Sequence, residues 1–250
     1  MYKTLLMMVA ALVLVPMAPA QTVDEIIARH IQARGGMEKL KSVATARQTA
    51  KPAGAFRLEI VREGKRPDKV RDEFIIQGMT SISAYDGKVG WRVNPFGGRR
   101  DPERLSEDDT KGLVEEADID GPLVDYQQKG HKAELVGHDS VEGTDCYKIK
   151  LTLKNGDIWT YYLDTDSYME LKLETQTTIR GAIQEGEQYF GDYDKVDGIY
   201  YPFALEYGQK GSTDREKITV EKVELNVPLD DSLFSMPAGK PETKAPTPGK

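Results

Sequence analysis

The stretch TDCYKIKLTLKNGDIWTYYLD, residues 144–164, decides the fold class of this chain. Apolar side chains occupy alternate positions on both sides of Asn155-Gly156, a dipeptide that suits the positive φ angles of a tight hairpin. Alternation with a period of two is typical of strands that bury one face. The stretch is therefore predicted to be an antiparallel hairpin with an apolar face made of Tyr147, Ile149, Leu151, Leu153, Trp159, Tyr161 and Leu163.

The same alternation extends over most of the chain after Val43. The dipeptides Asp86-Gly87 and Asp197-Gly198 indicate two more tight hairpins. Because successive strands joined by short turns pair with each other, we expect one antiparallel sheet with meander topology. The further predicted strands lie around residues 56–60, 70–76, 89–93, 169–173, 199–207 and 218–225.

Two segments are predicted to be helical. Thr22 and Glu25 form a capping box ahead of an amphipathic helix, and Gly35-Gly36 should end that helix. Residues 94–130 interrupt the strands, and within them Ser106 can cap a second helix. The predicted fold class is α+β, mainly β structure with an N-terminal amphipathic helix and a helical insertion.

The two ends of the chain differ from the rest. Lys3 precedes an apolar run too short to span a bilayer, and small residues follow at 18–20, which is the layout of a signal peptide over residues 1–20. Because residue 21 is Gln and not Cys, we expect an exported, non-lipidated protein in the periplasm of a Gram-negative bacterium. Residues 239–250 are predicted to be disordered, which leaves one domain over residues 21–238.

Charge and cysteine content limit the partners. Removing Lys3 with the leader leaves 33 basic and 41 acidic side chains, a formal charge of −8, which does not suit nucleic acid. Cys146 is the single cysteine, so the chain has no internal disulfide. Its place in an alternating segment predicts a buried, unreactive thiol.

The residues that usually carry catalysis are isolated from one another in the sequence. His30 lies on the apolar helix face, which favours a packed histidine, and the contiguous His138-Asp139-Ser140 would alternate between the two faces of a strand. Residues 192–197 resemble the start of a calcium loop but place Asp where that loop needs Gly. We expect no enzyme activity, no cofactor and no metal, with an unrecognised carboxylate pair acting on an envelope polymer as the enzymatic alternative.

Five stretches share their spacing and turns with a known family: residues 117–126 (ADIDGPLVDY), 137–150 (GHDSVEGTDCYKIK), 160–170 (TYYLDTDSYME), 190–207 (FGDYDKVDGIYYPFALEY) and 229–237 (LDDSLFSMP). They resemble the outer-membrane lipoprotein-sorting protein family, which comprises relatives of the periplasmic lipoprotein carrier (LolA-like). The resemblance covers nearly the whole chain between residues 22 and 237.

The resemblance implies an incomplete antiparallel β-barrel of about eleven strands, with helices on its concave side as a lid. In the family, the space under the lid receives acyl chains of lipoproteins or other lipids, or serves a sensor of mislocalised envelope components. An arginine of the barrel holds the lid closed in the carriers. The sequence leaves Arg57, Arg62 and Arg71 as equal candidates for that arginine.

Together, these features predict a carrier that shields the acyl chains of a lipoprotein or lipid and passes them from a membrane-side donor to an acceptor. A stress sensor or assembly protein that binds another protein is the alternative, with the sheet and lid packed solidly together. The apolar strand and insertion residues would then form an ordinary core. The candidate lining residues of the cavity are Phe56, Leu58, Ile60, Phe74, Ile76, Trp91, Val93, Leu113, Val114, Trp159 and Tyr161.

Overall fold

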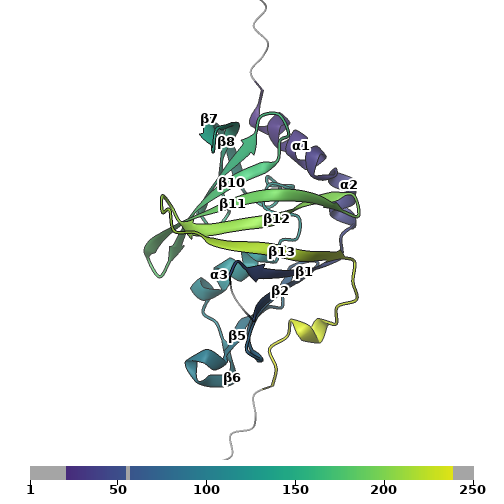
Figure 1. The fold of residues 1–250 in the computed structure, drawn as a ribbon, viewed down its shortest axis with the longest axis vertical. Coiled ribbons are helices and arrows are strands. Elements are labelled where there is room, and N and C mark those ends of the chain that lie inside the picture. Colours follow the sequence, from purple (N-terminus) through teal and green to yellow (C-terminus); the bar gives the residue numbers. More distant parts are fainter. Residues whose placement is uncertain (1–20, 55–56, 239–250) are drawn as a thin grey trace, which may run out of the picture.

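The structure is a computed structural model that describes residues 21–54 and 57–238 (Figure 1). The predicted signal peptide, Phe56 and the predicted disordered tail lie outside these residues, so the predictions made for them stay predictions. Within the described ranges, no helix is both long and apolar enough to cross a membrane.

Across the described residues, a single antiparallel sheet of thirteen strands dominates the fold, in agreement with the predicted fold class. Its order is β6-β5-β4-β3-β2-β1-β13-β12-β11-β10-β9-β8-β7, so neighbours are consecutive in sequence except where β1 meets β13. The strands are β1 (Thr45–Pro52), β2 (Leu58–Lys65), β3 (Lys69–Ile76), β4 (Met79–Tyr85), β5 (Gly90–Asn94), β6 (Arg99–Arg104), β7 (Lys132–Val141), β8 (Thr144–Thr152), β9 (Ile158–Asp164), β10 (Glu170–Ile179), β11 (Ala182–Val196), β12 (Ile199–Gln209) and β13 (Glu216–Leu225).

The described chain therefore has more strands than the eleven or so that the resemblance implied. Strand β6 lies in the segment that the sequence assigned to the insertion, because its sequence RRDPER has no apolar alternation. It nevertheless pairs with β5, with Trp91 opposite Arg104. Pro102 is tolerated there because β6 is an edge strand, which has one side without a pairing partner.

Both predicted helix starts are confirmed. Helix α1 (Val23–Arg34) begins with the capping box, in which Thr22 and Glu25 each accept a hydrogen bond from the other's backbone N–H. Helix α3 (Glu107–Glu116) begins after Ser106, whose hydroxyl accepts from the Asp109 N–H at 3.2 Å. Figure 1 shows α1 beside the short helix α2 (Met37–Ser42) at one end of the sheet. The 3₁₀ turns are η1 (Pro95–Gly97) and η2 (Asp231–Leu233).

Gly35 makes the corner between α1 and α2 possible. Its φ of 140° lies in the region that favours glycine. A Cβ atom at this position would lie 2.6 Å from the carbonyl oxygen of Gly198, in the turn between β11 and β12. The corner therefore seats directly on that turn and fixes the two helices against the sheet.

The main core lies between α1 and the hairpin of β8 and β9. Ile26 and Ile27 of α1 are buried together with Ile149, Leu151 and Leu163, so the hairpin predicted from residues 144–164 supplies much of this core. Each fully buried aliphatic side chain of this size stabilises the fold by roughly 1.5–3 kcal/mol. This core fixes α1 against the sheet.

The opposite face of the sheet is covered by the C-terminal segment around η2. Phe234 and Trp91 are both fully buried, and the Trp91 Nε1–H donates to the Phe234 carbonyl at 2.7 Å. The Arg71 guanidinium lies 5.8 Å from the Trp91 ring centre and donates to the Leu233 carbonyl. Lys65 pairs with Asp231 at 2.7 Å, which ties η2 to the end of β2.

Candidate functional site

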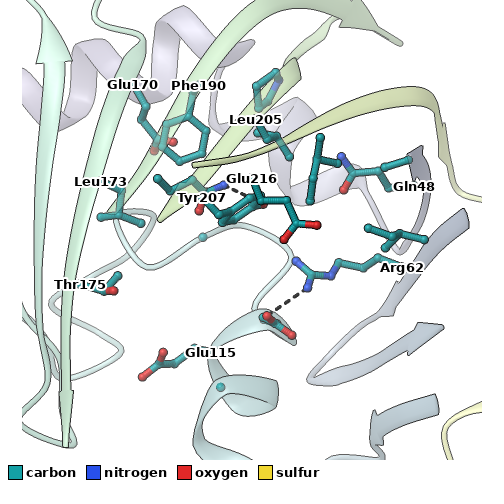
Figure 2. Close-up of a pocket in the computed structure, with 18 of the residues that line it drawn as sticks. Gln48, Arg62, Glu115, Glu170, Leu173, Thr175, Phe190, Leu205, Tyr207 and Glu216 are labelled. Atoms are coloured by element: carbon teal, nitrogen blue, oxygen red, sulfur yellow. Dashed lines mark hydrogen bonds and ion pairs between the residues drawn. The ribbon is translucent and has the colours of Figure 1, made fainter. Parts of the chain in front are cut away.

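A cavity of about 980 Å³ lies between the sheet, helix α3 and the loop that follows α3 (Figure 2). Its lining residues come from ten of the described strands, β1 to β5 and β9 to β13. One sheet can surround a space in this way only if it is strongly curved. Gly112, Glu115 and Glu116 of α3 and Gly121-Pro122 of the following loop close the cavity on its other side.

Six of the candidate residues line this cavity. Leu58 lies opposite Ile76, and Ile60 lies opposite Phe74, in the pairing of β2 with β3. Directly opposed residues point to the same face of a sheet, so these four side chains form one continuous apolar wall. Trp159 and Tyr161 line the cavity from β9, on the far side.

The prediction that Trp91 and Val93 line the cavity is wrong. Trp91 pairs with Ala84, and Val93 pairs with Ile82, whereas the adjacent Ser81 is the residue of β4 that lines the cavity. Both side chains therefore point to the opposite face, where Phe234 covers Trp91. Alternation shows that a strand has two different faces, but it does not show which of them becomes concave.

The two insertion residues are also misplaced in the prediction. Leu113 is buried against Val70 and Ala117, below the cavity, and Val114 is 47% exposed on the outer side of α3. The helix presents Gly112, Glu115 and Glu116 to the cavity. Apolar residues of a lid helix can serve to anchor it to the sheet, and here that is the role of Leu113. Phe56, the eleventh candidate, lies outside the described residues.

Several lining residues were not predicted, although strands were predicted at β10, β12 and β13 and the Asp197-Gly198 turn implied β11. These lining residues occupy alternate or nearly alternate positions on β10 to β13, so apolar alternation was the signal that could have found them. They are Leu173, Phe190, Tyr193, Leu205, Tyr207 and Ile218. Phe190 and Tyr193 both face the cavity although they are three residues apart. Asp192 between them has a φ of 50°, and the pairing with β12 is interrupted there. This irregularity resets the alternation and could not be placed from the sequence.

Arg62 connects the sheet to the lid helix. Its Nε donates to Asp72 Oδ1 at 2.6 Å on the neighbouring strand, and its Nη2 lies 3.0 Å from Glu116 Oε1 on α3 (Figure 2). Among the three candidate arginines, Arg71 faces the opposite side of the sheet with Glu73 and Leu233. Arg62 thus joins β2 to α3, the helix that covers the cavity, through its ion pair with Glu116, and this contact is called the latch below.

The two carboxyl groups that α3 presents to the cavity, Glu115 and Glu116, are buried enough to oppose their ionisation. Burial raises the pKa of Glu116 to about 7, against the lowering effect of Arg62. Burial likewise raises the pKa of Glu115 to about 7, although it accepts a hydrogen bond from the Asn155 amide at 3.3 Å. For Arg62, burial alone would lower the pKa, but Glu116 and Asp72 raise it above its ordinary value. Arg62 is therefore cationic throughout the physiological range.

The loop after α3 is fixed at a second point. The Asp120 carboxylate is 3% exposed and accepts hydrogen bonds from Arg66 Nη1 at 2.9 Å and Lys41 Nζ at 2.8 Å. Burial opposes ionisation of Asp120, but the hydrogen bonds from Arg66 and Lys41 lower its pKa below the ordinary value. The base of the lid is thus held by buried charges, while the helix itself is held by the more exposed Arg62 contact.

Comparison with known proteins gives two informative matches. No family model matches the chain, and no curated protein matches it by sequence. A DUF1329 family protein from Desulfovibrio piger is similar with a TM-score of 0.58 at 13% identity, covering 86% of this chain and 98% of that protein. A LolA superfamily protein from Nitrosomonas europaea is similar with a TM-score of 0.56, at the same identity and coverage. The chain has a LolA-like fold.

The cavity is covered on one side by a helix and a loop and not by the sheet. A single curved sheet provides the walls, and the chain between β6 and β7 provides the cover. Helix α3 packs on β3, β4 and β5, and its side chains also reach Arg62 on β2 and the Thr178 carbonyl on β10. None of its residues belongs to the core under α1.

Proposed function

We propose that this protein is a non-enzymatic periplasmic carrier that shields the acyl chains of a lipoprotein or lipid for transfer towards the outer membrane. It would receive them from a membrane-side donor and pass them to an acceptor. The observation that carries the proposal is the apolar cavity of about 980 Å³ under the lid helix α3. This volume is at the upper end of the range of about 300–1,000 Å³ that is usual for ligand pockets.

The energetics of acyl chains demand a cover that opens at low cost. Each buried methylene contributes about 0.8 kcal/mol, so a fully enclosed chain would be released very slowly. Part of that gain must be offset by the free energy of opening the lid. The Arg62–Glu116 contact supports this role, because burial raises the pKa of Glu116 to about 7. Near neutral pH this carboxyl group is therefore partly protonated, which weakens the ion pair.

The alternative function, a sensor or assembly protein that binds another protein, predicted that sheet and lid would pack solidly together. A cavity of about 150 Å³ is enough to hold a benzene ring, and the cavity here is several times larger. The cavity therefore favours the carrier over the alternative.

Gly112 offers a direct test of the cavity. It lines the cavity from α3, and a Cβ atom added there would meet nothing within 4 Å. We expect Gly112→Leu to fill part of the cavity and weaken binding of a fluorescent alkyl probe about tenfold or more. The matched control is Gly112→Ala, which should keep the probe affinity and stabilise the helix by about 1 kcal/mol.

Two results would contradict the carrier function. One is the absence of any alkyl probe binding to the unmodified protein at high micromolar concentration. The other is equal probe affinity in Gly112→Leu and Gly112→Ala, which would place the probe elsewhere. Native mass spectrometry of protein purified gently from periplasm then identifies the lipid or lipoprotein that accompanies it.

A further inference from the structure

We propose that Glu170 selects the polar end of the ligand, and that the cavity takes amphiphiles with an N–H-donating head group, an ammonium or an amide, in preference to anionic ones. This assignment rests on the proposed function, because it specifies the head group of a molecule whose alkyl chain fills the cavity. Glu170 begins β10 and lines the cavity on the wall that also carries Leu173 (Figure 2).

A buried histidine behind Glu170 makes this carboxylate unusual. His30 of α1 is 1% exposed, and its Nδ1 lies 2.9 Å from the Tyr168 carbonyl oxygen. A carbonyl oxygen can only accept, so Nδ1 carries the proton of that hydrogen bond. The other ring nitrogen, Nε2, lies 3.4 Å from Glu170 Oε1 and makes no hydrogen bond with any described residue.

When His30 is neutral and Glu170 is ionised, no hydrogen lies between His30 Nε2 and Glu170 Oε1. With His30 neutral and Glu170 ionised, the Nε2 lone pair faces a carboxylate, and two acceptors then oppose each other. A single proton on either group removes the conflict. Burial, the largest influence on His30, lowers its pKa, so the imidazole loses its proton readily. An ammonium at the cavity side of Glu170 would neutralise the carboxylate in place of that proton, and an amide N–H would donate a hydrogen bond to it.

The charged groups around the pair favour a donor over an anion. Arg34 of α1 is the cation on this side of the cavity, and its Nη1 already donates to the Asp120 carbonyl at 3.2 Å. Arg62 is bound to Asp72 and Glu116. The other groups facing the pair are the hydroxyls of Tyr161 on β9 and Tyr193 on β11, and the latter donates to the Glu170 backbone carbonyl at 2.9 Å. The acidic residues that line the cavity are Glu115, Glu116, Asp118, Glu170 and Glu216.

The test compares four probes with the same ten-carbon chain: decylamine, decanamide, decanol and decanoate. Their dissociation constants are measured by titration calorimetry on the purified protein at pH 7.5. Because a charge-assisted hydrogen bond is stronger than a neutral one, we expect the two N–H donors to bind about tenfold tighter than decanoate. Glu170→Gln should remove this preference by weakening the two N–H donors relative to decanoate. Glu134→Gln, at an exposed position on β7 outside the cavity, should leave all four affinities unchanged.

A second readout needs no variant. A protonated His30 competes with a ligand ammonium for Glu170, and burial lowers the pKa of His30 below its ordinary value. Decylamine should therefore bind more tightly at pH 7.5 than at pH 5, while decanol should not. Decylamine remains cationic over this range, as a lysine side chain does. Decanoate binding as tightly as the two N–H probes, or decylamine affinity that ignores both the pH and Glu170→Gln, would overturn the head-group assignment alone. Failure of decanol and the other probes to bind at all would overturn the carrier function with it.

Discussion

Glu115 lines the cavity, and its burial lowers the stability of the folded protein at high pH. Burial raises its pKa to about 7 in the folded protein, whereas an unfolded chain loses this proton near pH 4.5. Between these two values the unfolded state binds fewer protons than the folded state, so the free energy of unfolding falls as the pH rises. Glu115 therefore destabilises the fold above about pH 7 and has no such effect below about pH 4.5.

Replacing this carboxylate should reverse the effect. We expect Glu115→Gln to be more stable than the unmodified protein at pH 8, with the difference shrinking towards pH 5, as measured by urea unfolding at both values. Glu134→Gln, at an exposed position on β7, is the matched control and should change neither curve. A stability difference that is the same at pH 5 and pH 8 would show that Glu115 is not desolvated.

Arg62 should control the mobility of the lid. Its replacement in Arg62→Gln removes the contacts with Asp72 and Glu116, and we expect faster amide hydrogen exchange in α3. The loss of stability should be about 3–5 kcal/mol, because Asp72 is 5% exposed and loses its cationic partner. Arg47→Gln is the control, because Arg47 pairs with Glu63 at 2.7 Å without reaching α3. Equal exchange of α3 in the two variants would contradict the latch.

At the scale of elements, the segment around η2 acts as a clamp on the face opposite the cavity. Phe234→Ala removes a fully buried ring next to Trp91. We expect the free energy of unfolding, measured with urea, to fall by about 3–5 kcal/mol. Pro237→Ala, three residues away and exposed, should have little effect. Since the clamp is outside the cavity, alkyl probe affinity at low denaturant should remain as in the unmodified protein. A weakened affinity would mean that the two faces are coupled.

The elements also show what could be predicted from sequence. Caps at Thr22 and Ser106 and the Asn155-Gly156 turn are local signals, and each was correct because local chemistry decides it. The orientation of Trp91 and Val93 was not local. It depends on which way the whole sheet curves and on the distant Phe234, neither of which alternation records. The His30–Glu170 contact was hidden for the same reason, since 140 positions separate its members.

At the scale of the whole molecule, ligand and fold should stabilise each other. A ligand that binds only the folded state at about 100 times its dissociation constant adds about 2.7 kcal/mol. For a chain of this size we expect the melting temperature to rise by about 5–10 °C with saturating decylamine, as measured by calorimetry. Gly112→Leu, at the same ligand concentration, should show a smaller rise. Equal rises in both proteins would place the ligand outside the cavity.

The pairing of β1 with β13, called the seam below, determines when during folding the cavity is complete. It pairs Ala46 with Leu225, whereas the other strand pairs of the described sheet join neighbours in sequence. Local hairpins form quickly, and long-range pairings pay loop-closure entropy first, so we expect the seam to close late in folding. The cavity takes its walls from both sides of the seam. A chain in which β13 has not yet paired with β1 would therefore have no chamber to load.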